Sequence, residues 1–381
     1  MYDLDIAYGT LDDQLALLAH AESIGLPVTY VELGNEFYLD GAVSKFATVE
    51  DYGIKASEWA SEITSQHPGA RVGVVGWDRN KIFTATERQS TWNSRLRPFI
   101  EANPHITSLT VHPYTFINYL QRLHGEILDL SPANIQRLLA MAADASTDIM
   151  EVIADDLPAG TSVWATEYNL VDLKYKVATA RWIHGVWTSA AAMQLAQVPG
   201  LDVALVHSWS GPMTFAANHS PVYAENFFNE YGVNMVPWGL TACGVGISDV
   251  YRTLDGAERI ATIDFDGADQ ITTTVAGTTR VYSSLIGIKT ASRSGDKACI
   301  ANLSDQPVTV NLHRYGLPPN GRWQQHTSAP STVVADATTD VTTTEGPVSA
   351  HVELAPYSVT TVAGPENGHG PGPGVGHGHG Q

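Results

Sequence analysis

Up to about residue 255, segments with apolar residues at helical spacing alternate with short, continuous apolar runs. Residues 11–24 carry apolar side chains at helical spacing and end before Gly25, which predicts an amphipathic helix. The β-branched run from Val28 to Leu33 then predicts a short buried strand that Gly34 ends. Helices alternating with buried strands predict a parallel sheet in an α/β fold. Further helices are expected over 49–65, 91–101, 131–155, 178–197 and 238–251, and further strands over 71–77, 106–112, 161–169 and 201–207.

From about Glu258 the pattern changes to short Thr- and Val-rich strands separated by turns. This pattern predicts an all-β sandwich domain over 258–363, after an α/β domain over 1–257. The expected strands are 260–265, 270–276, 279–288, 297–303, 308–312, 346–354 and 359–363. Residues 364–381 are almost entirely Gly, Pro and His, a composition that cannot bury apolar surface and predicts disorder. Three histidines of this tail could touch a metal, but we expect a flexible tail or a cloning remnant instead: His369, His377 and His379.

The charge and composition of the chain disfavour some classes of binding partner. The formal net charge is −19 and the sequence pI is about 5.0, which disfavours binding to nucleic acid or to anionic membranes. The hydrophobic fraction of 44% supports a large core, yet no apolar run is long enough to span a bilayer. The only cysteines, Cys243 and Cys299, lie in apolar contexts and are expected in the core. The first residues lack the features of a signal peptide, so we expect a soluble protein, with its compartment left open.

Two glutamates stand at the ends of predicted strands. Glu36 follows the strand that Gly34 ends, and Glu167 ends the strand over 161–169. The carboxyl ends of parallel strands share one edge of a sheet, where ligand-binding groups collect. A pair of carboxylates at one site is what glycoside hydrolysis needs, one as general acid/base and one as nucleophile. The alternative is that each is a solvated carboxylate or a helix cap.

The segment Glu32-Leu33-Gly34-Asn35-Glu36 resembles the clan A retaining glycoside hydrolases, and among them the heparanase/β-glucuronidase and α-L-arabinofuranosidase families. The order of predicted elements agrees with that resemblance over nearly the whole chain. The resemblance implies a (β/α)8 TIM-type barrel with the acid/base Glu36 on the fourth strand and the nucleophile Glu167 on the seventh. His112 and Tyr114 would then lie on the sixth strand and Trp209 on the eighth.

The resemblance also implies roles for the residues around the two acids. Asn35 would hydrogen-bond the sugar 2-hydroxyl, and His112 would line the sugar site. Tyr114 would donate to Glu167, or simply pack in its loop. Trp209 would stack under a sugar ring, or lie in the core. Trp77, and beside it Asp78, could reach the pocket rim from the end of the fifth strand.

The chemistry implied is a two-glutamate double displacement with retention of configuration, on a carbohydrate substrate and without metal or organic cofactor. It requires a raised pKa at Glu36 and carboxyl groups roughly 5–5.5 Å apart. The alternatives are a truncated, non-catalytic carbohydrate-binding relative and an interaction module. The chain is expected to supply only barrel strands four to eight, which would leave Val31 and Leu33 facing water at an open edge. A homo-oligomer, most simply a dimer, is therefore expected to cover the open barrel side.

Overall fold

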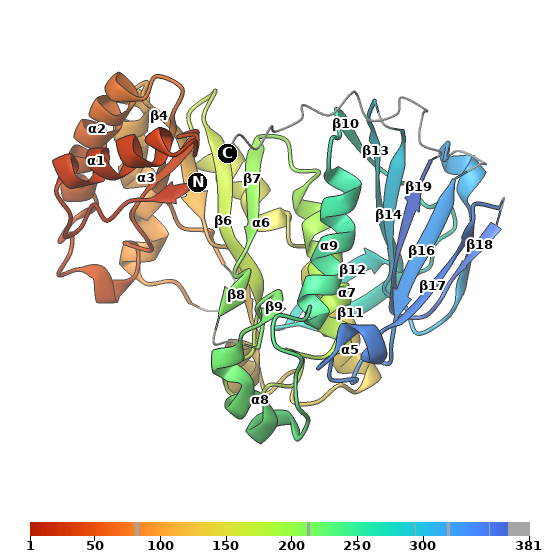
Figure 1. Cartoon of the computed structure of the whole chain (residues 1–381). Coiled ribbons are helices and arrows are strands. Elements are labelled where there is room, and N and C mark those ends of the chain that lie inside the picture. Colours follow the sequence, from red (N-terminus) through yellow and green to blue (C-terminus); the bar gives the residue numbers. More distant parts are fainter. Residues whose placement is uncertain (81–83, 212–213, 294, 318–320, 350, 365–381) are drawn as a thin grey trace, which may run out of the picture.

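The computed structural model describes residues 1–80, 84–211, 214–293, 295–317, 321–349 and 351–364, so the tail and its three histidines lie outside the described residues. The N-terminal half is a parallel sheet whose strands follow the order β1-β2-β3-β4-β6, with β5 and β7 both paired to β6. This is the expected partial barrel (Figure 1). Its strands are β1 (Tyr2–Asp3), β2 (Tyr30–Leu33), β3 (Arg71–Val75), β4 (Ile106–Val111), β5 (Tyr114–Phe116), β6 (Ser162–Val171) and β7 (Leu201–Val206).

Helices connect the strands of this half-barrel. Those beside the first strands are α1 (Leu11–Ser23), α2 (Val49–Gln66) and α3 (Glu87–Ala102), and those that follow are α4 (Ile117–Tyr119), α5 (Pro132–Ala143), α6 (Thr147–Asp155), α7 (Trp182–Leu195), α8 (Ala224–Tyr231) and α9 (Ala242–Leu254). Short turns of helix, η1 (Asp40–Ala42), η2 (Leu120–His124) and η3 (Pro221–Tyr223), and a small pair of strands, β8 (Ser210–Gly211) and β9 (Asn218–His219), complete this part.

Several helix predictions were wrong at their boundaries, and α7 and α9 each begin four residues after the expected start. Helix α3 begins four residues before the expected start because Thr86 and Gln89 form a capping box, in which each side chain binds the other residue's backbone N–H. The single helix expected over 131–155 is two helices, since the chain turns between Ala143 and Thr147 while the apolar spacing continues through the turn.

The expected open edge at β2 is also wrong. Strand β1 pairs in parallel with β2, with Tyr2 opposite Val31, so β2 lies inside the sheet. Val31 and Leu33 are fully buried, because the segment after β1 contributes Leu4 and Ile6 to the same core. Within the described residues, the strands of this sheet that pair on one side only are β1, β5 and β7.

The C-terminal half is antiparallel. Six strands form one sheet in the order β10-β13-β14-β19-β16-β17, and β15 and β18 pair separately. A hairpin, β11–β12, leaves this half and contacts α5 of the half-barrel. The elements are β10 (Arg259–Thr262), β11 (Gln270–Val275), β12 (Thr278–Ser283), β13 (Leu285–Ala291), β14 (Lys297–Asn302), β15 (Val308–Asn311), η4 (Leu312–Tyr315), β16 (Arg322–Thr327), α10 (Ala337–Asp340), β17 (Thr342–Pro347), β18 (His351–Leu354) and β19 (Ser358–Ala363).

The six-stranded sheet is buried on both faces. Along β14, Ala298 and Ile300 pack into a core shared with β15 and β18, which is the sandwich expected from the sequence. The alternate residues Cys299 and Ala301 point to the other face and join the large core that contains α7 and α9. Both cysteines are fully buried and unpaired, as expected. Helices α7 and α9 therefore lie between the two sheets and fix the halves to each other (Figure 1).

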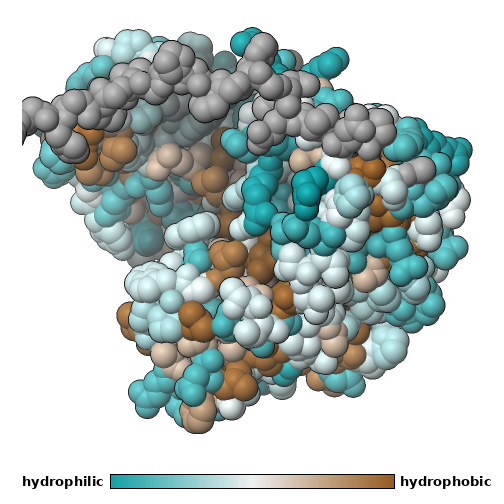
Figure 2. All heavy atoms as spheres, turned by 45° about the vertical axis from the view of Figure 1, so that its right-hand side comes forward, coloured by the Kyte–Doolittle hydropathy of each residue, from teal (hydrophilic) through white to brown (hydrophobic). Residues whose placement is uncertain are grey.

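The surface is hollowed between the α1–α3 part and the rest of the molecule, and apolar atoms are visible in the floor of that hollow (Figure 2). Among the described residues, none of the helices combines the length and the apolar character that crossing a bilayer requires.

Candidate active site

The end of β2 is shaped by two residues with left-handed backbone. Gly34 has φ +87° and Glu36 has φ +52°. A Cβ at Gly34 would lie 2.4 Å from the Phe37 ring and 2.9 Å from Ile6, so only glycine fits there. Glu36 is no glycine, and a left-handed conformation at such a residue is uncommon away from functional sites. The turn lifts the Glu36 side chain out of the strand and toward the sheet's carboxyl edge.

Buried hydrogen bonds hold this turn in place. The Tyr52 hydroxyl donates to the Leu33 carbonyl at 2.9 Å and accepts from the Val75 N–H at 2.8 Å, so it ties the ends of β2 and β3 together. The Arg88 guanidinium donates to the carbonyls of Phe37 and Phe46. Because these groups come from α2 and α3, the position of Glu36 depends on two packed helices.

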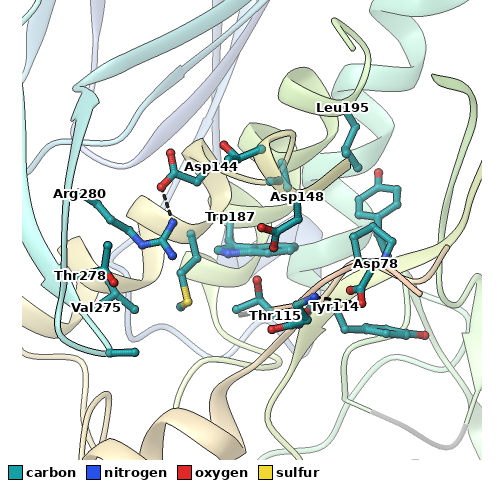
Figure 3. A pocket seen from close by; sticks show the side chains of 18 of the residues that line it. Asp78, Tyr114, Thr115, Asp144, Asp148, Trp187, Leu195, Val275, Thr278 and Arg280 are labelled. Atoms are coloured by element: carbon teal, nitrogen blue, oxygen red, sulfur yellow. Dashed lines mark hydrogen bonds and ion pairs between the residues drawn. The ribbon is translucent and has the colours of Figure 1, made fainter. Parts of the chain in front are cut away.

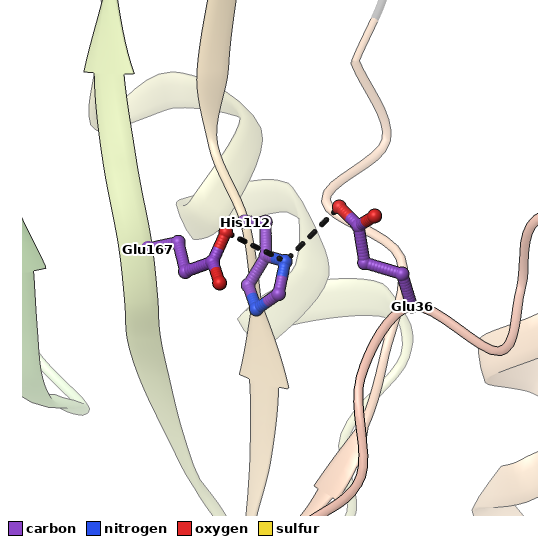
Figure 4. A group of neighbouring side chains, drawn as sticks. All are labelled: Glu36, His112 and Glu167. Atoms are coloured by element: carbon purple, nitrogen blue, oxygen red, sulfur yellow. Dashed lines mark hydrogen bonds and ion pairs between the residues drawn. The ribbon is translucent and has the colours of Figure 1, made fainter. Parts of the chain in front are cut away.

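Three side chains from three strands meet at the carboxyl edge. His112, just beyond β4, lies between Glu36 and Glu167, the latter on β6 (Figure 4). Its Nδ1 is 3.1 Å from Glu36 Oε1 and 3.6 Å from Glu167 Oε2. One ring nitrogen of His112 and one carboxylate oxygen of each glutamate lie within 4.8 Å of one another. The four strand-end residues Glu36, His112, Tyr114 and Glu167, expected to cluster, are therefore in one site.

Each carboxylate has a tyrosine donor. The Tyr114 hydroxyl donates to Glu167 Oε2 at 2.7 Å and lies 2.5 Å from Nδ1 of His207, which follows β7. The Tyr38 hydroxyl donates to Glu36 Oε1 at 3.2 Å. Burial raises the pKa of the Tyr114 hydroxyl, and the Glu167 charge raises it further. The tyrosines therefore stay protonated and orient the carboxylates as donors.

A third acid, which is buried, lies beneath the site. Glu32, on β2, is 5% exposed and accepts a 3.0 Å hydrogen bond from the Thr166 hydroxyl. The Thr166 hydroxyl also lies 3.1 Å from Nε2 of His112, and Glu32 Oε1 lies 3.9 Å from the same ring nitrogen. His112 is thus held from both ring nitrogens.

The acids control the charge of His112. Burial alone lowers its pKa, but Glu32, Glu36 and Glu167 outweigh burial and raise the pKa to about 10. Burial raises the pKa of Glu36, but the His112 hydrogen bond and charge outweigh it, so the pKa of Glu36 lies below its ordinary value. This differs from the raised pKa expected for an acid/base catalyst. The reason is that the protein places a proton on His112, one hydrogen bond from Glu36.

The remaining predicted site residues lie at the same edge of the fold with different exposure. Asn35 is exposed, and Trp209, after β7, is 66% exposed, which excludes the alternative of a core Trp. Trp77 is half-buried after β3, where Asn93 binds both its backbone N–H and its carbonyl at 2.8 Å. Asp78 is buried, and it lines a separate pocket on the helix side of the sheet.

Several site residues were missed in the sequence: Glu32, Tyr38, Thr166 and His207. Glu32 and Thr166 could have been found, because polar side chains at alternate positions of otherwise apolar strands face one side of the sheet. His207 was expected only as the end of a strand.

Glu36, His112 and Glu167 are also the described residues whose atoms could hold a metal ion. An imidazole must be neutral to bind a metal, and the three surrounding acids instead favour its protonated form. The donor set therefore fits acid–base chemistry better than metal binding.

Comparison with solved structures identifies the fold. An α-L-arabinofuranosidase from Thermotoga maritima, solved as an arabinose complex, superposes with a TM-score of 0.65 at 14% identity, over 95% of this chain and 74% of that one. A family 51 α-L-arabinofuranosidase from Bifidobacterium longum gives 0.67 at 11% identity, over 95% and 75%. The chain shares the fold of these two enzymes. A 4-O-α-L-rhamnosyl-β-D-glucuronidase from Fusarium oxysporum gives 0.57 at 14% identity, over 95% and 76%.

The TIM-type half-barrel followed by a β domain, which the sequence predicts, is thereby confirmed. A protein-family model described as the C-terminal immunoglobulin-like domain of D-apionate lactonase matches residues 286–362, within the predicted sandwich. No curated protein matches the sequence.

Proposed function

We propose that this protein is a retaining glycoside hydrolase in which Glu167 is the nucleophile and Glu36 the acid/base catalyst. The observation that carries the proposal is the approach of the two carboxylates, with one oxygen of each within 4.8 Å of the other. Retaining enzymes hold their carboxyl groups about 5–5.5 Å apart, whereas inverting enzymes leave about 6.5–9.5 Å for a water. The observed approach supports direct attack by one carboxylate.

In the first step Glu167 attacks the anomeric carbon while a proton passes from Glu36 to the departing glycosidic oxygen. In the second step water attacks the glycosyl–enzyme ester, gives its proton to Glu36 and releases Glu167. The hydrogen bond from Tyr114 keeps Glu167 oriented for attack.

His112 is the source of the proton that Glu36 delivers. In the free protein the proton is held on His112, 3.1 Å from Glu36. As negative charge develops on the leaving oxygen, the His112 proton crosses the hydrogen bond to Glu36 and passes on to that oxygen, which leaves His112 neutral and Glu36 ionised. In the second step Glu36 accepts the proton of the attacking water and returns it to His112. His112 is thus a positioning residue that stores the proton.

The fold relatives, which include arabinofuranosidases and a glucuronidase, support a choice of substrate class to test. We therefore propose aryl α-L-arabinofuranosides and aryl β-D-glucuronides as first substrates, with the exposed indole of Trp209 as a stacking surface and Asn35 and Trp77 at the sugar's edge.

The test compares leaving groups in two variants. Glu167→Gln should abolish turnover of every glycoside. Glu36→Gln should lower kcat by about 10²–10⁴ on poor leaving groups, yet give a rapid burst of aryl release from an activated one, because only the second step then needs the catalyst. Glu58→Gln, on the exposed face of α2, is the matched control and should retain full activity. Equal losses for all leaving groups in Glu36→Gln would contradict the role assignment.

A second candidate is hydrolysis of a sugar lactone, favoured by the match of residues 286–362 to a lactonase domain. An aldonolactone added to the same panel separates the two: a lactonase opens the lactone and leaves aryl glycosides intact. Failure on both substrate types, with sugar binding retained, would favour the non-catalytic carbohydrate-binding protein.

A further inference from the structure

A pocket lies outside the barrel, on the helix side of the sheet. Its volume is about 380 Å³, within the range of small-molecule sites. The hairpin β11–β12 forms one wall and α5, α6 and α7 form the others (Figure 3). Arg280 of the hairpin and Asp144, after α5, form an ion pair at one end, and both side chains are partly exposed there. The pocket therefore opens at the ion pair and closes toward Asp78 and Tyr114.

Two buried donors in this pocket have no partner within the described residues. The Trp187 side chain is 1% exposed, and its indole N–H makes no hydrogen bond. The Arg280 Nε–H is also buried and unpaired, although the guanidinium contacts Asp144 through Nη1. Figure 3 shows the indole at the back of the pocket with its nitrogen end toward Arg280. A buried donor without a partner is costly, and two facing one space indicate a place for an acceptor oxygen.

The opposite end offers acceptors. The Asp78 carboxylate is 5% exposed and accepts a long 3.3 Å hydrogen bond from the Asn80 N–H. Asp148 of α6 lines the same pocket. Burial raises the pKa of Asp78 to about 7, and the Asp148 charge adds to the rise, so hydroxyl donors from a ligand would stabilise the ionised form of Asp78.

We propose that this pocket is a second, non-catalytic site that binds a neutral monosaccharide. A sugar ring carries hydroxyls that both donate and accept, which matches two orphan donors at one end and two carboxylates at the other. The Trp187 indole and the side chains of Met141 and Ala191 supply the apolar surface that a sugar face needs.

Two other ligand classes fit less well. Among the described lining residues Arg280 is the cation, and Asp144 already pairs with it, so the described lining offers an anionic uronate no unpaired positive charge. A divalent cation needs carboxylate oxygens close together, and within the described residues only Glu36, His112 and Glu167 bring such atoms within 4.8 Å.

This site is separate from the catalytic centre but touches it. Glu167 and Tyr168 are adjacent on β6 and point to opposite faces, and only Tyr168 lines the pocket. Tyr114 belongs to both: it lines the pocket, its carbonyl accepts from Asn80 Nδ2 at 2.8 Å, and its hydroxyl donates to Glu167. A bound sugar would therefore contact the residue that orients the nucleophile.

The experiment follows the indole N–H resonances of the whole protein by NMR during titration with L-arabinose, D-xylose and D-glucuronate. We expect the neutral pentoses to shift the Trp187 indole signal along a saturating curve, and D-glucuronate to leave it unchanged. Signals of Trp77 and Trp209 report the catalytic end separately, so the outcome does not depend on whether the protein turns over glycosides.

Variants test the donors. Trp187→Phe and Arg280→Lys remove the two orphan N–H groups, and each should weaken pentose binding by about two- to tenfold in calorimetry. Trp164→Phe is the matched control, because that Trp is fully buried with an unpaired indole N–H but lies outside the pocket. An unshifted Trp187 signal in the wild-type protein would overturn the proposal without any variant. So would a shift with D-glucuronate alone, with calcium alone, or equal weakening by all three variants.

Discussion

His112 carries the positive charge that compensates the carboxylates of the candidate site. It is 6% exposed, and three carboxylates surround it. Removing one partner of a buried ionic cluster leaves the others uncompensated, which is more costly than the cluster's net contribution to stability. The position should therefore respond strongly to substitution, and the response should depend on pH.

We predict that His112→Gln lowers the free energy of unfolding by about 3–5 kcal/mol near pH 6. The folded pKa of about 10 lies above the unfolded value near 6.5, so the stabilisation is complete below pH 6.5 and is lost as pH rises through 10. In urea titrations, the difference in the free energy of unfolding between wild type and variant should therefore shrink as the pH rises from 6.5 to 10.

His184 provides a control, because the effect of its substitution on stability should depend on pH in the opposite direction. It is fully buried, and burial lowers its pKa to about 3. Between pH 3 and 6.5 only the unfolded state takes the proton, so the wild type loses stability there and the cost of His184→Gln should shrink as pH falls. A pH-independent gap for His112→Gln would contradict the assigned charge.

At the same scale, Glu36, His112, Tyr114 and Glu167 were predictable because the end of a buried strand can be recognised in sequence. Tyr38 and His207 were not, because their hydroxyl and imidazole reach the site through the turn after β2 and the loop after β7. Those paths depend on tertiary packing that local spacing does not encode.

At the scale of elements, strongly periodic segments were predicted and polar ones were missed. The strand β16, Arg-Trp-Gln-Gln-His-Thr, has the composition of a loop, yet Gln325 and His326 are buried. Gln325 donates to the Thr360 hydroxyl at 2.9 Å, and His326 lies 2.7 Å from Asp249 of α9. The strand is stabilised by partners distant in sequence, which no local pattern reveals. Conversely, the segments expected over 279–288 and 346–354 are each two strands, because short turns do not interrupt their β-rich composition.

The turn after β2 gives a prediction at this scale. Gly34→Ala should reduce stability by more than Gly25→Ala, although the two glycines have nearly equal φ, +87° and +84°. A Cβ at Gly25 would meet open space, so its replacement costs only about 1–2 kcal/mol of backbone strain. At Gly34 the clash with Phe37 adds to that strain and displaces Glu36.

Thermal unfolding and kcat measured together test this. Gly34→Ala should lose both stability and turnover, whereas Gly25→Ala should lose stability alone. Equal effects on turnover would mean that the turn does not position the acid.

For the whole molecule, the unpaired edges of β1 and β7 remain the reason to propose a dimer. Along β7 every residue is partly or fully exposed, and Leu205 is 39% exposed. A parallel strand with an open edge and a half-covered face is rare in isolated proteins. Since β2 is covered, residues of β7 and β1, rather than Val31 and Leu33, should lie in the interface.

Light scattering at micromolar concentration should give the mass of a dimer, whose interface buries more than about 1,000 Å². Leu205→Lys should produce monomers, because a lysine on an edge strand opposes pairing. Leu17→Lys, at a similarly exposed position of α1, should leave the dimer intact. A wild-type mass equal to one chain at all concentrations would refute the dimer.

The position of α7 between the two sheets has a consequence for synthesis. Thirteen of its fourteen residues are buried, and the Trp182 indole donates to the carbonyl of Tyr357, 175 residues later. At about 5–20 residues per second, the ribosome takes roughly 9–35 s to make the intervening chain. The last strand, β19, then inserts between β14 and β16 rather than at an edge. Part of the apolar surface of α7 therefore stays exposed on the nascent chain during this time. The two halves reach their final packing only after nearly all of the described chain has been made.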